Sequence, residues 1–165
     1  MNRNPLSLLV ILLLLVILVD TGCRKHSRDD IAPFPSDTSR FFVHTAPPYY
    51  NGYHYSHYYD GSLRHEGNFK NGVASGHWKF YWPNGLLMKE GNYNNGRMSG
   101  QWKFFYPNGN LKEEGNYNNN VRSGHWKFFH ENGVLRTEGN YNNNRRTGRW
   151  RFYYPNGQFS HQIDY

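Results

Sequence analysis

Residues 76–99 read GHWKFYWPNGLLMKEGNYNNGRMS, and most of the chain after this stretch repeats it at a fixed spacing. The tryptophan near its start recurs every 24 residues, at Trp78, Trp102, Trp126 and Trp150. Its first glycine, its Asn-Gly pair and its Glu-Gly pair recur at the same step. A fixed period of this length is typical of repeat proteins, in which each unit buries its apolar face only by stacking on its copies.

Each unit is predicted to form a β-hairpin. Its first half alternates aromatic and polar residues, and the Asn84-Gly85 pair that follows is typical of a two-residue type I′ turn. With that turn, three informative pairs face each other: Trp82 with Leu87, Lys79 with Glu90, and Trp78 with Gly91. We therefore expect each indole to cover the bare backbone of a facing glycine, and each of these lysines to face a glutamate.

The combined pattern of Trp, Asn-Gly, Glu-Gly and Tyr resembles the bacterial variant of MORN repeats over about residues 52–165. The resemblance implies an all-β fold, an elongated single-layer antiparallel sheet of stacked 24-residue hairpins. It also implies a non-enzymatic scaffold that binds proteins or membrane surfaces, with no catalytic residue. Related bacterial proteins often carry the label of an antitoxin, so an antitoxin-like neutraliser of a toxin is one alternative.

The repeat domain is expected to span residues 52–165, with units beginning at residues 52, 76, 100 and 124 and a partial unit at 148. The first unit is degenerate because His54 replaces the tryptophan, as is usual for a terminal repeat. The last hairpin has three expected pairs: Trp150 with Ile163, Arg151 with Gln162, and Tyr154 with Phe159. It lacks the facing glycine and glutamate, so we interpret both terminal units as caps.

Residues 1–22 are predicted to be an export signal. Arg3 precedes an aliphatic run from Leu6 to Val19, which is shorter than the roughly 20 apolar residues that cross a bilayer core. Thr21-Gly22-Cys23 resembles a bacterial lipoprotein signal, which is cut before the cysteine and acylated there, although Asp20 stands where such signals usually carry an aliphatic residue. The alternatives are an ordinary signal peptide or a short uncleaved anchor, with Cys23 a bystander.

Residues 23–51 combine the predicted lipid-attachment cysteine with a flexible linker rich in charges and prolines, which buries too little apolar surface to fold alone. Arg24, Lys25 and Arg28 would lie beside an anchored lipid, or form a solvated leader. We therefore expect an exported, membrane-anchored lipoprotein of the bacterial cell envelope, periplasmic or surface-exposed. The single cysteine excludes an intrachain disulfide, so stacked sheet alone must hold the fold.

Two rows of aromatic side chains follow from the period-two pattern. The row expected to form the repeat core comprises Trp78, Trp102, Trp126, Trp150, Phe80, Phe104, Phe128 and Phe152. The row on the opposite face, which a single-layer sheet leaves partly exposed, comprises Tyr81, Phe105, Phe129 and Tyr153. An exposed aromatic row suits a partner's apolar strip or sugar rings, so a glycan- or cell-wall-binding module is a further alternative.

The chain carries a net charge of +7, and the arginines without a facing glutamate concentrate near the connections between hairpins. They are Arg97, Arg122, Arg145, Arg146 and Arg149. We expect them to line one edge of the sheet, where they either bind an anionic partner, such as lipid headgroups, acidic glycans or an acidic protein, or form a solvated rim. Nucleic acid suits the same mixture of basic and aromatic residues but is a poor match for an exported chain.

Nine histidines raise the question of a metal site. Four of them lie close together, but His54 and His57 point to opposite faces of a strand, and no acidic or thiol group lies at ligand spacing. Ser75, Ser99 and Ser123 precede the unit glycines and have no His-Asp pair placed to activate them. We therefore expect no metal, no cofactor and no catalytic residue.

Overall fold

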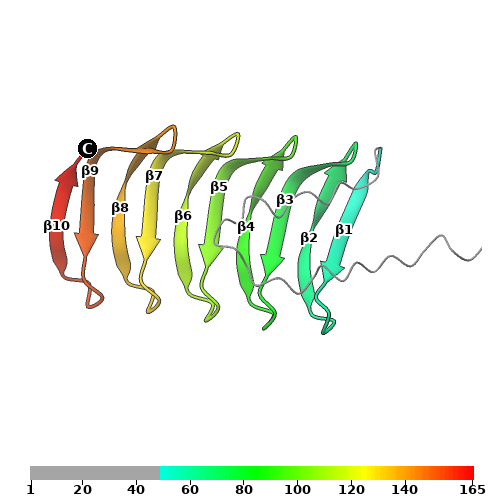
Figure 1. Cartoon of the computed structure of the whole chain (residues 1–165), viewed down its shortest axis with the longest axis horizontal. Coiled ribbons are helices and arrows are strands. Elements are labelled where there is room, and N and C mark those ends of the chain that lie inside the picture. Colours follow the sequence, from blue (N-terminus) through cyan, green and yellow to red (C-terminus); the bar gives the residue numbers. More distant parts are fainter. Residues whose placement is uncertain (1–48) are drawn as a thin grey trace, which may run out of the picture. The chain divides into compact units, whose positions relative to one another are not determined.

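The computed structural model describes residues 49–165, which form one antiparallel sheet with its strands in sequence order (Figure 1). The strands are β1 (Gly52–His57), β2 (Leu63–Lys70), β3 (Val73–Tyr81), β4 (Leu87–Asn94), β5 (Arg97–Phe105), β6 (Leu111–Asn118), β7 (Val121–Phe129), β8 (Leu135–Asn142), β9 (Arg145–Tyr153) and β10 (Phe159–Asp164). The predicted all-β, single-layer fold is confirmed. The predicted signal, the lipid-attachment Cys23 and most of the linker lie outside the described residues.

The predicted register is confirmed away from the loops. Four expected pairs are observed: Trp78 with Gly91, Lys79 with Glu90, Trp150 with Ile163, and Arg151 with Gln162. The equivalent Trp–Gly and Lys–Glu pairs recur in the β5–β6 and β7–β8 hairpins. The copied sequence therefore produces a copied register.

Next to the hairpin loops, the predicted pairing is wrong by one residue. Leu87 pairs with Tyr81 rather than with Trp82. In the last hairpin, Phe159 likewise pairs with Tyr153 rather than with Tyr154. Both differences have one cause, because the loop at the lower edge of the sheet in Figure 1 is longer than a two-residue turn.

The loop between β3 and β4 is a type I turn followed by a glycine bulge. The Gly85 N–H donates to the Trp82 carbonyl at 2.9 Å, and the Trp82 N–H donates to the Leu86 carbonyl at 2.8 Å. Only Gly85 in this loop has a positive φ, 80°, whereas a type I′ turn requires two positive values. Pro83 explains the choice, because a two-residue turn would require it to donate a hydrogen bond to Leu86 and proline has no N–H.

Type I′ turns do occur, but between the units rather than within them. Asn95 and Gly96 join β4 to β5 with φ values of 48° and 73°. Asn119 and Asn120 join β6 to β7 with 51° and 69°. Two positive values in succession define this turn, and asparagine tolerates them better than most residues. These two-residue turns lie at the upper edge of the sheet in Figure 1.

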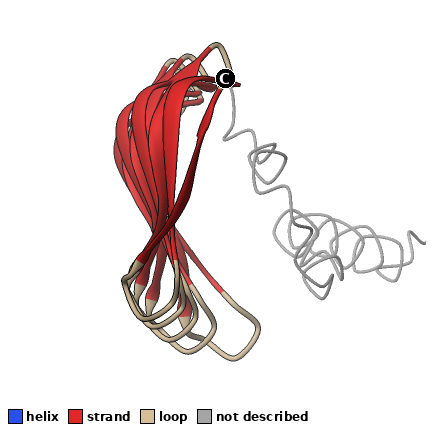
Figure 2. Cartoon of the chain, turned by 90° about the vertical axis from the view of Figure 1, so that its left-hand side faces the viewer, coloured by secondary structure: helices blue, strands red, loops and turns tan. Residues whose placement is uncertain are grey.

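The facing charges continue across the units as one row with alternating sign. From β2 to β9, the paired residues are Glu66, Lys79, Glu90, Lys103, Glu114, Lys127, Glu138 and Arg151. Each facing pair of opposite charges contributes about 0.2–1 kcal/mol. We call the face that carries this row the ladder face, and the opposite face, which carries the tryptophans, the indole face. Figure 2 shows the sheet from its end as one layer of bent strands.

Each indole covers a glycine, but the glycine belongs to the preceding unit. A Cβ added at Gly91 would lie 2.2 Å from Trp102, and one at Gly67 would lie 2.1 Å from Trp78. The expectation that the indole covers the glycine of its own hairpin is therefore wrong. The indole nitrogen of Trp102 also donates to the Asn92 carbonyl of the preceding unit at 3.1 Å. The tryptophan thus joins neighbouring units.

Hydrogen bonds between successive turns join the units along both edges as well. At the lower edge, the Asn84 amide donates to the Pro107 carbonyl at 2.7 Å, and Asn108 donates likewise to the Glu131 carbonyl at 2.9 Å. At the upper edge, the Met98 N–H donates to the Asn120 side chain at 2.7 Å. Residues 49–165 include no helix that is long and apolar enough to cross a membrane.

Candidate partner-binding faces

The indole face carries the predicted aromatic core. The four tryptophans are fully buried, at 0% exposure, Phe80 and Phe128 are buried, and Phe104 and Phe152 are half-buried. The prediction did not include the tyrosines Tyr93, Tyr117 and Tyr141, whose rings meet the edge of the following indole at centroid distances of 5.0–5.1 Å. The sequence could have predicted these tyrosines, because each occupies the same repeat position, two residues after a Glu-Gly pair.

Two arginines lie on this aromatic surface. The guanidinium carbon of Arg122 is 4.4 Å from the ring centroid of Trp126, and that of Arg146 is 4.3 Å from the ring centroid of Trp150. A guanidinium group stacked on an indole at this distance is held by cation–π attraction, and its planar N–H donors point outward from the stack. Both side chains are thereby presented in a defined orientation.

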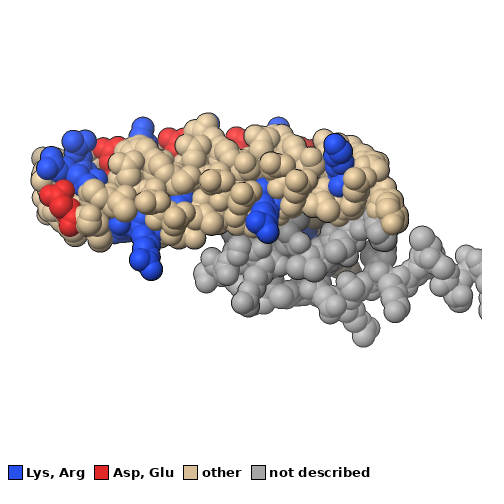
Figure 3. Space-filling view, turned by 90° about the horizontal axis from the view of Figure 1, so that it is seen from above, with Lys and Arg blue, Asp and Glu red and all other residues tan. Residues whose placement is uncertain are grey.

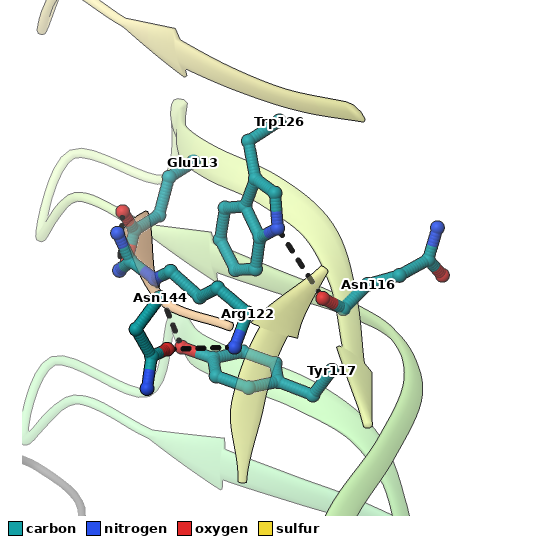
Figure 4. A network of polar contacts seen from close by, with 6 residues as sticks. All are labelled: Glu113, Asn116, Tyr117, Arg122, Trp126 and Asn144. Atoms are coloured by element: carbon teal, nitrogen blue, oxygen red, sulfur yellow. Dashed lines mark hydrogen bonds and ion pairs between the residues drawn. The ribbon is translucent and has the colours of Figure 1, made fainter. Parts of the chain in front are cut away.

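The Arg122 guanidinium on β7 forms an ion pair with Glu113 on the neighbouring strand β6 (Figure 4). One terminal nitrogen lies 3.0 and 3.1 Å from the two carboxylate oxygens of Glu113, and the Tyr117 hydroxyl lies 3.4 Å from Nε. Burial alone would lower the pKa of Arg122, but Glu113 and the Tyr117 hydroxyl outweigh it and raise that pKa. The Arg122 backbone N–H donates to the Asn144 side chain at 2.7 Å, which ties the site to the next turn.

Arg146 differs from Arg122 in exposure and in its partners. Its side chain is exposed, and it donates a hydrogen bond to the Tyr165 hydroxyl at 2.8 Å. Desolvation lowers the pKa of Arg146, but contacts with Tyr141 and Tyr165 outweigh it and raise that pKa. The guanidinium of Arg146 is therefore charged at any physiological pH.

The second aromatic row lies on the ladder face, where all four rings are half-buried: Tyr81, Phe105, Phe129 and Tyr153. The Tyr81 hydroxyl donates to Glu66 at 2.6 Å, and the Tyr153 hydroxyl donates to Glu138 at 3.2 Å. Burial and the neighbouring carboxylate raise the pKa of Tyr81, while hydrogen bonds from Tyr53 and Tyr81 lower the pKa of Glu66. These tyrosines are held in place by the charged row.

The five arginines predicted to line one edge are divided between the two faces. Arg97 and Arg145 begin their strands, so they point to the opposite face from Arg122 and Arg146, which occupy the second position. Arg149 lies further along β9, where its Nε is 3.3 Å from Asp164. Figure 3 shows basic side chains spread along the sheet rather than gathered in one patch.

Histidines on the ladder face contact the row of charges. His77 lies 3.3 Å from Glu90, and His125 lies 3.3 Å from Glu138. Within residues 49–165, no group of three or more His, Cys, Asp or Glu side chains is placed to hold a metal ion.

The comparison with protein families agrees with this architecture. The model described as the MORN repeat variant matches residues 74–95, 98–119, 122–143 and 146–165, one segment for each hairpin from β3 onward. A comparison with curated proteins gives no match. The β1–β2 hairpin lies outside the matched segments but continues the same sheet. MORN repeats generally mediate protein or membrane interactions, and the chain belongs to the MORN repeat variant family.

Proposed function

We propose that this chain is a non-enzymatic scaffold, anchored at the bacterial cell envelope, that binds a protein partner on the indole face of its C-terminal repeats. The observation that carries the proposal is the pair of arginines stacked on Trp126 and Trp150, surrounded by tyrosines. Arginine, tryptophan and tyrosine are the residues that most often dominate the energetics of protein interfaces. The anchoring rests on the sequence Thr21-Gly22-Cys23.

A protein partner fits this face better than a lipid surface does. Aromatic anchors in membrane interfaces need rings that reach the headgroup region. Here the four tryptophans are fully buried, and Trp126 is covered by the Arg122 guanidinium. The basic side chains are also spread along the sheet (Figure 3), whereas attraction to an anionic membrane grows with their clustering.

A glycan- or cell-wall-binding module is the second candidate. It is favoured by Phe105 and Phe129, which are half-buried on the ladder face and have no hydroxyl through which a carboxylate could hold them. Their rings are suited to stack on sugars. A toxin neutralised by this chain would be one kind of protein partner, and that idea rests on the labelling of related proteins.

Crosslinking in intact cells tests the proposal. The full chain is crosslinked and purified beside two variants, Cys23→Ala and the double variant Arg122→Met with Arg146→Met. We expect a defined protein partner to be crosslinked to the unmodified chain and lost from the double variant, and we expect Cys23→Ala to leave the membrane fraction. Binding to isolated cell-wall polymer without any crosslinked protein would instead support the glycan module and overturn the proposal.

A further inference from the structure

The third and fourth matched repeats place an arginine in the same surroundings on the indole face. Arg122 lies 4.4, 5.5 and 5.6 Å from the ring centroids of Trp126, Phe128 and Tyr141. Arg146 lies 4.3, 6.0 and 5.5 Å from those of Trp150, Phe152 and Tyr165. One site is therefore nearly a copy of the other, displaced by one unit.

The two sites differ in the residue that faces the arginine. Next to Arg122 this residue is Glu113, on the preceding strand β6, whose carboxylate oxygens lie 3.0 and 3.1 Å from the Arg122 guanidinium. One unit later, the same position is Thr137, which is buried and donates its hydroxyl to the Arg151 carbonyl at 2.8 Å. Threonine carries no charge, so the site at Arg146 keeps the arginine but has no acid at this position.

Arg146 is also more accessible than its counterpart. It is exposed, whereas Arg122 is half-buried, and its side chain contacts the hydroxyl of Tyr165 at 2.8 Å and that of Tyr141. A guanidinium fixed over aromatic rings presents its free donors in a plane that matches the two oxygens of a carboxylate. The site at Arg122 shows the occupant that this arrangement accepts.

We propose that Arg146 binds a carboxylate from an acidic segment of the partner protein, which takes the place beside Arg146 that Glu113 takes beside Arg122. This inference rests on the proposed function and names the chemistry of the partner. The contact is a charge-assisted, two-point interaction on a surface already ordered by Trp150 and Tyr165. Little side-chain freedom is lost on binding, because the stacked guanidinium is pre-oriented.

The chain itself provides matched variants. Arg146→Met removes the charge but keeps the packing, since Met98 occupies this position one repeat earlier than Arg122 and is buried beside Trp102. Thr137→Glu gives the site at Arg146 the acid that the site at Arg122 has, and so supplies an internal partner for Arg146. Arg145→Met removes the same charge from the adjacent residue on the opposite face, so it controls for general electrostatic attraction.

The test is an NMR titration of the full chain in detergent, with arginine labelled and the Arg146 Nε–H signal assigned through Arg146→Met. The probes are acetylated hexaglutamate, acetylated hexaglutamine and inorganic phosphate. We expect hexaglutamate to shift the Arg146 signal saturably and hexaglutamine to leave it unchanged. Arg146→Met and Thr137→Glu should each weaken hexaglutamate binding about tenfold or more, and Arg145→Met by less than about twofold.

Three results would overturn the inference. One is equal weakening by Arg145→Met and Arg146→Met, which would show unspecific charge attraction. Another is unchanged binding by Thr137→Glu, which would place the peptide elsewhere. The third is phosphate acting at lower concentration than hexaglutamate, which would indicate a phosphate or lipid headgroup site. Crosslinking separates the failure of this inference from the failure of the proposed function. If the Arg146→Met variant still crosslinks the partner, the scaffold function is supported and the carboxylate site at Arg146 is refuted.

Discussion

The contact between Trp126 and Gly115 gives the sharpest test of how the repeats hold together. A Cβ added at Gly115 would lie 2.2, 2.3 and 2.6 Å from three atoms of the indole ring. The ring has nowhere to move, because it is fully buried, its nitrogen donates to the Asn116 carbonyl at 3.2 Å, and the Arg122 guanidinium lies above it. Gly115→Ala must therefore displace the indole or separate β6 from β7.

The cost of Gly115→Ala follows from these contacts. Inserting a methyl group into a packed site costs about 1–3 kcal/mol, and losing the indole hydrogen bond adds about 0.5–1.5 kcal/mol. We expect the free energy of unfolding to fall by about 2–4 kcal/mol, measured by urea denaturation followed by circular dichroism. The control is Gly133→Ala in a hairpin loop, where the added Cβ meets only an Asn110 atom at 4.0 Å. There, only the positive φ of 84° is penalised, by about 1–2 kcal/mol.

A double-mutant cycle isolates the contact between the ring and the backbone. In a Trp126→Leu background, the space next to Gly115 is open, so adding Gly115→Ala should cost less than about 0.5 kcal/mol more. The contact between the Trp126 ring and the Gly115 backbone is refuted if Gly115→Ala lowers the free energy of unfolding equally in both backgrounds. It is also refuted if Gly115→Ala costs no more than Gly133→Ala.

Three further predictions concern a turn, a buried charge and the carboxylate site. Asn119→Ala should lower the free energy of unfolding by about 1–2 kcal/mol because φ there is 51°, and thermal denaturation should show Asn119→Gly near the parent value. Burial lowers the pKa of Lys89 to about 8, so the unfolded chain holds a proton that the folded chain has lost above that pH. Stability should therefore rise between pH 8 and 10, by at most about 1.4 kcal/mol per pH unit, and denaturation of Lys89→Met should lack this rise. Glu113→Thr makes the site at Arg122 resemble the site at Arg146, so calorimetry should show two hexaglutamate sites instead of one; a single site would contradict the role given to Thr137.

The sequence predicts the sheet and most of its register because three full copies predict the same Trp–Gly and Lys–Glu pairs. The loop prediction failed since the Asn-Gly pair, considered alone, satisfies a type I′ turn. Pro83, one position earlier, cannot donate the hydrogen bond that this turn needs, but the β7–β8 loop has the same hydrogen bonds with Glu131 at the position of the proline. The type I′ turns use Asn-Gly and Asn-Asn pairs between the units, so an Asn-Gly pair by itself does not distinguish the two kinds of loop.

Two other features depend on information that the period does not contain. Trp78 has a glycine on each neighbouring strand, Gly67 and Gly91, and only the direction of the side chain decides which one the indole covers. The division of the arginines between the two faces was not predicted, for a different reason. The prediction treats residues before Gly124 as part of the connection, whereas β7 begins at Val121. Counted along the longer strand, Arg122 and Trp126 share a face.

Comparison of the repeats within this chain separates the residues that build the sheet from those that give it specificity. Every stacked contact uses the same indole over the same bare backbone, and changing either residue forces neighbouring units apart. Beside each Trp–Gly contact lie two positions on neighbouring strands whose chemistry changes from repeat to repeat: His65 and Ala74, Lys89 and Met98, Glu113 and Arg122, and Thr137 and Arg146. The hydrogen bonds along both edges and the Trp–Gly contacts fix the backbone. These positions can therefore vary without altering the sheet. A scaffold of this kind selects its partner through those pairs, and the fourth pair combines an exposed arginine with an uncharged threonine.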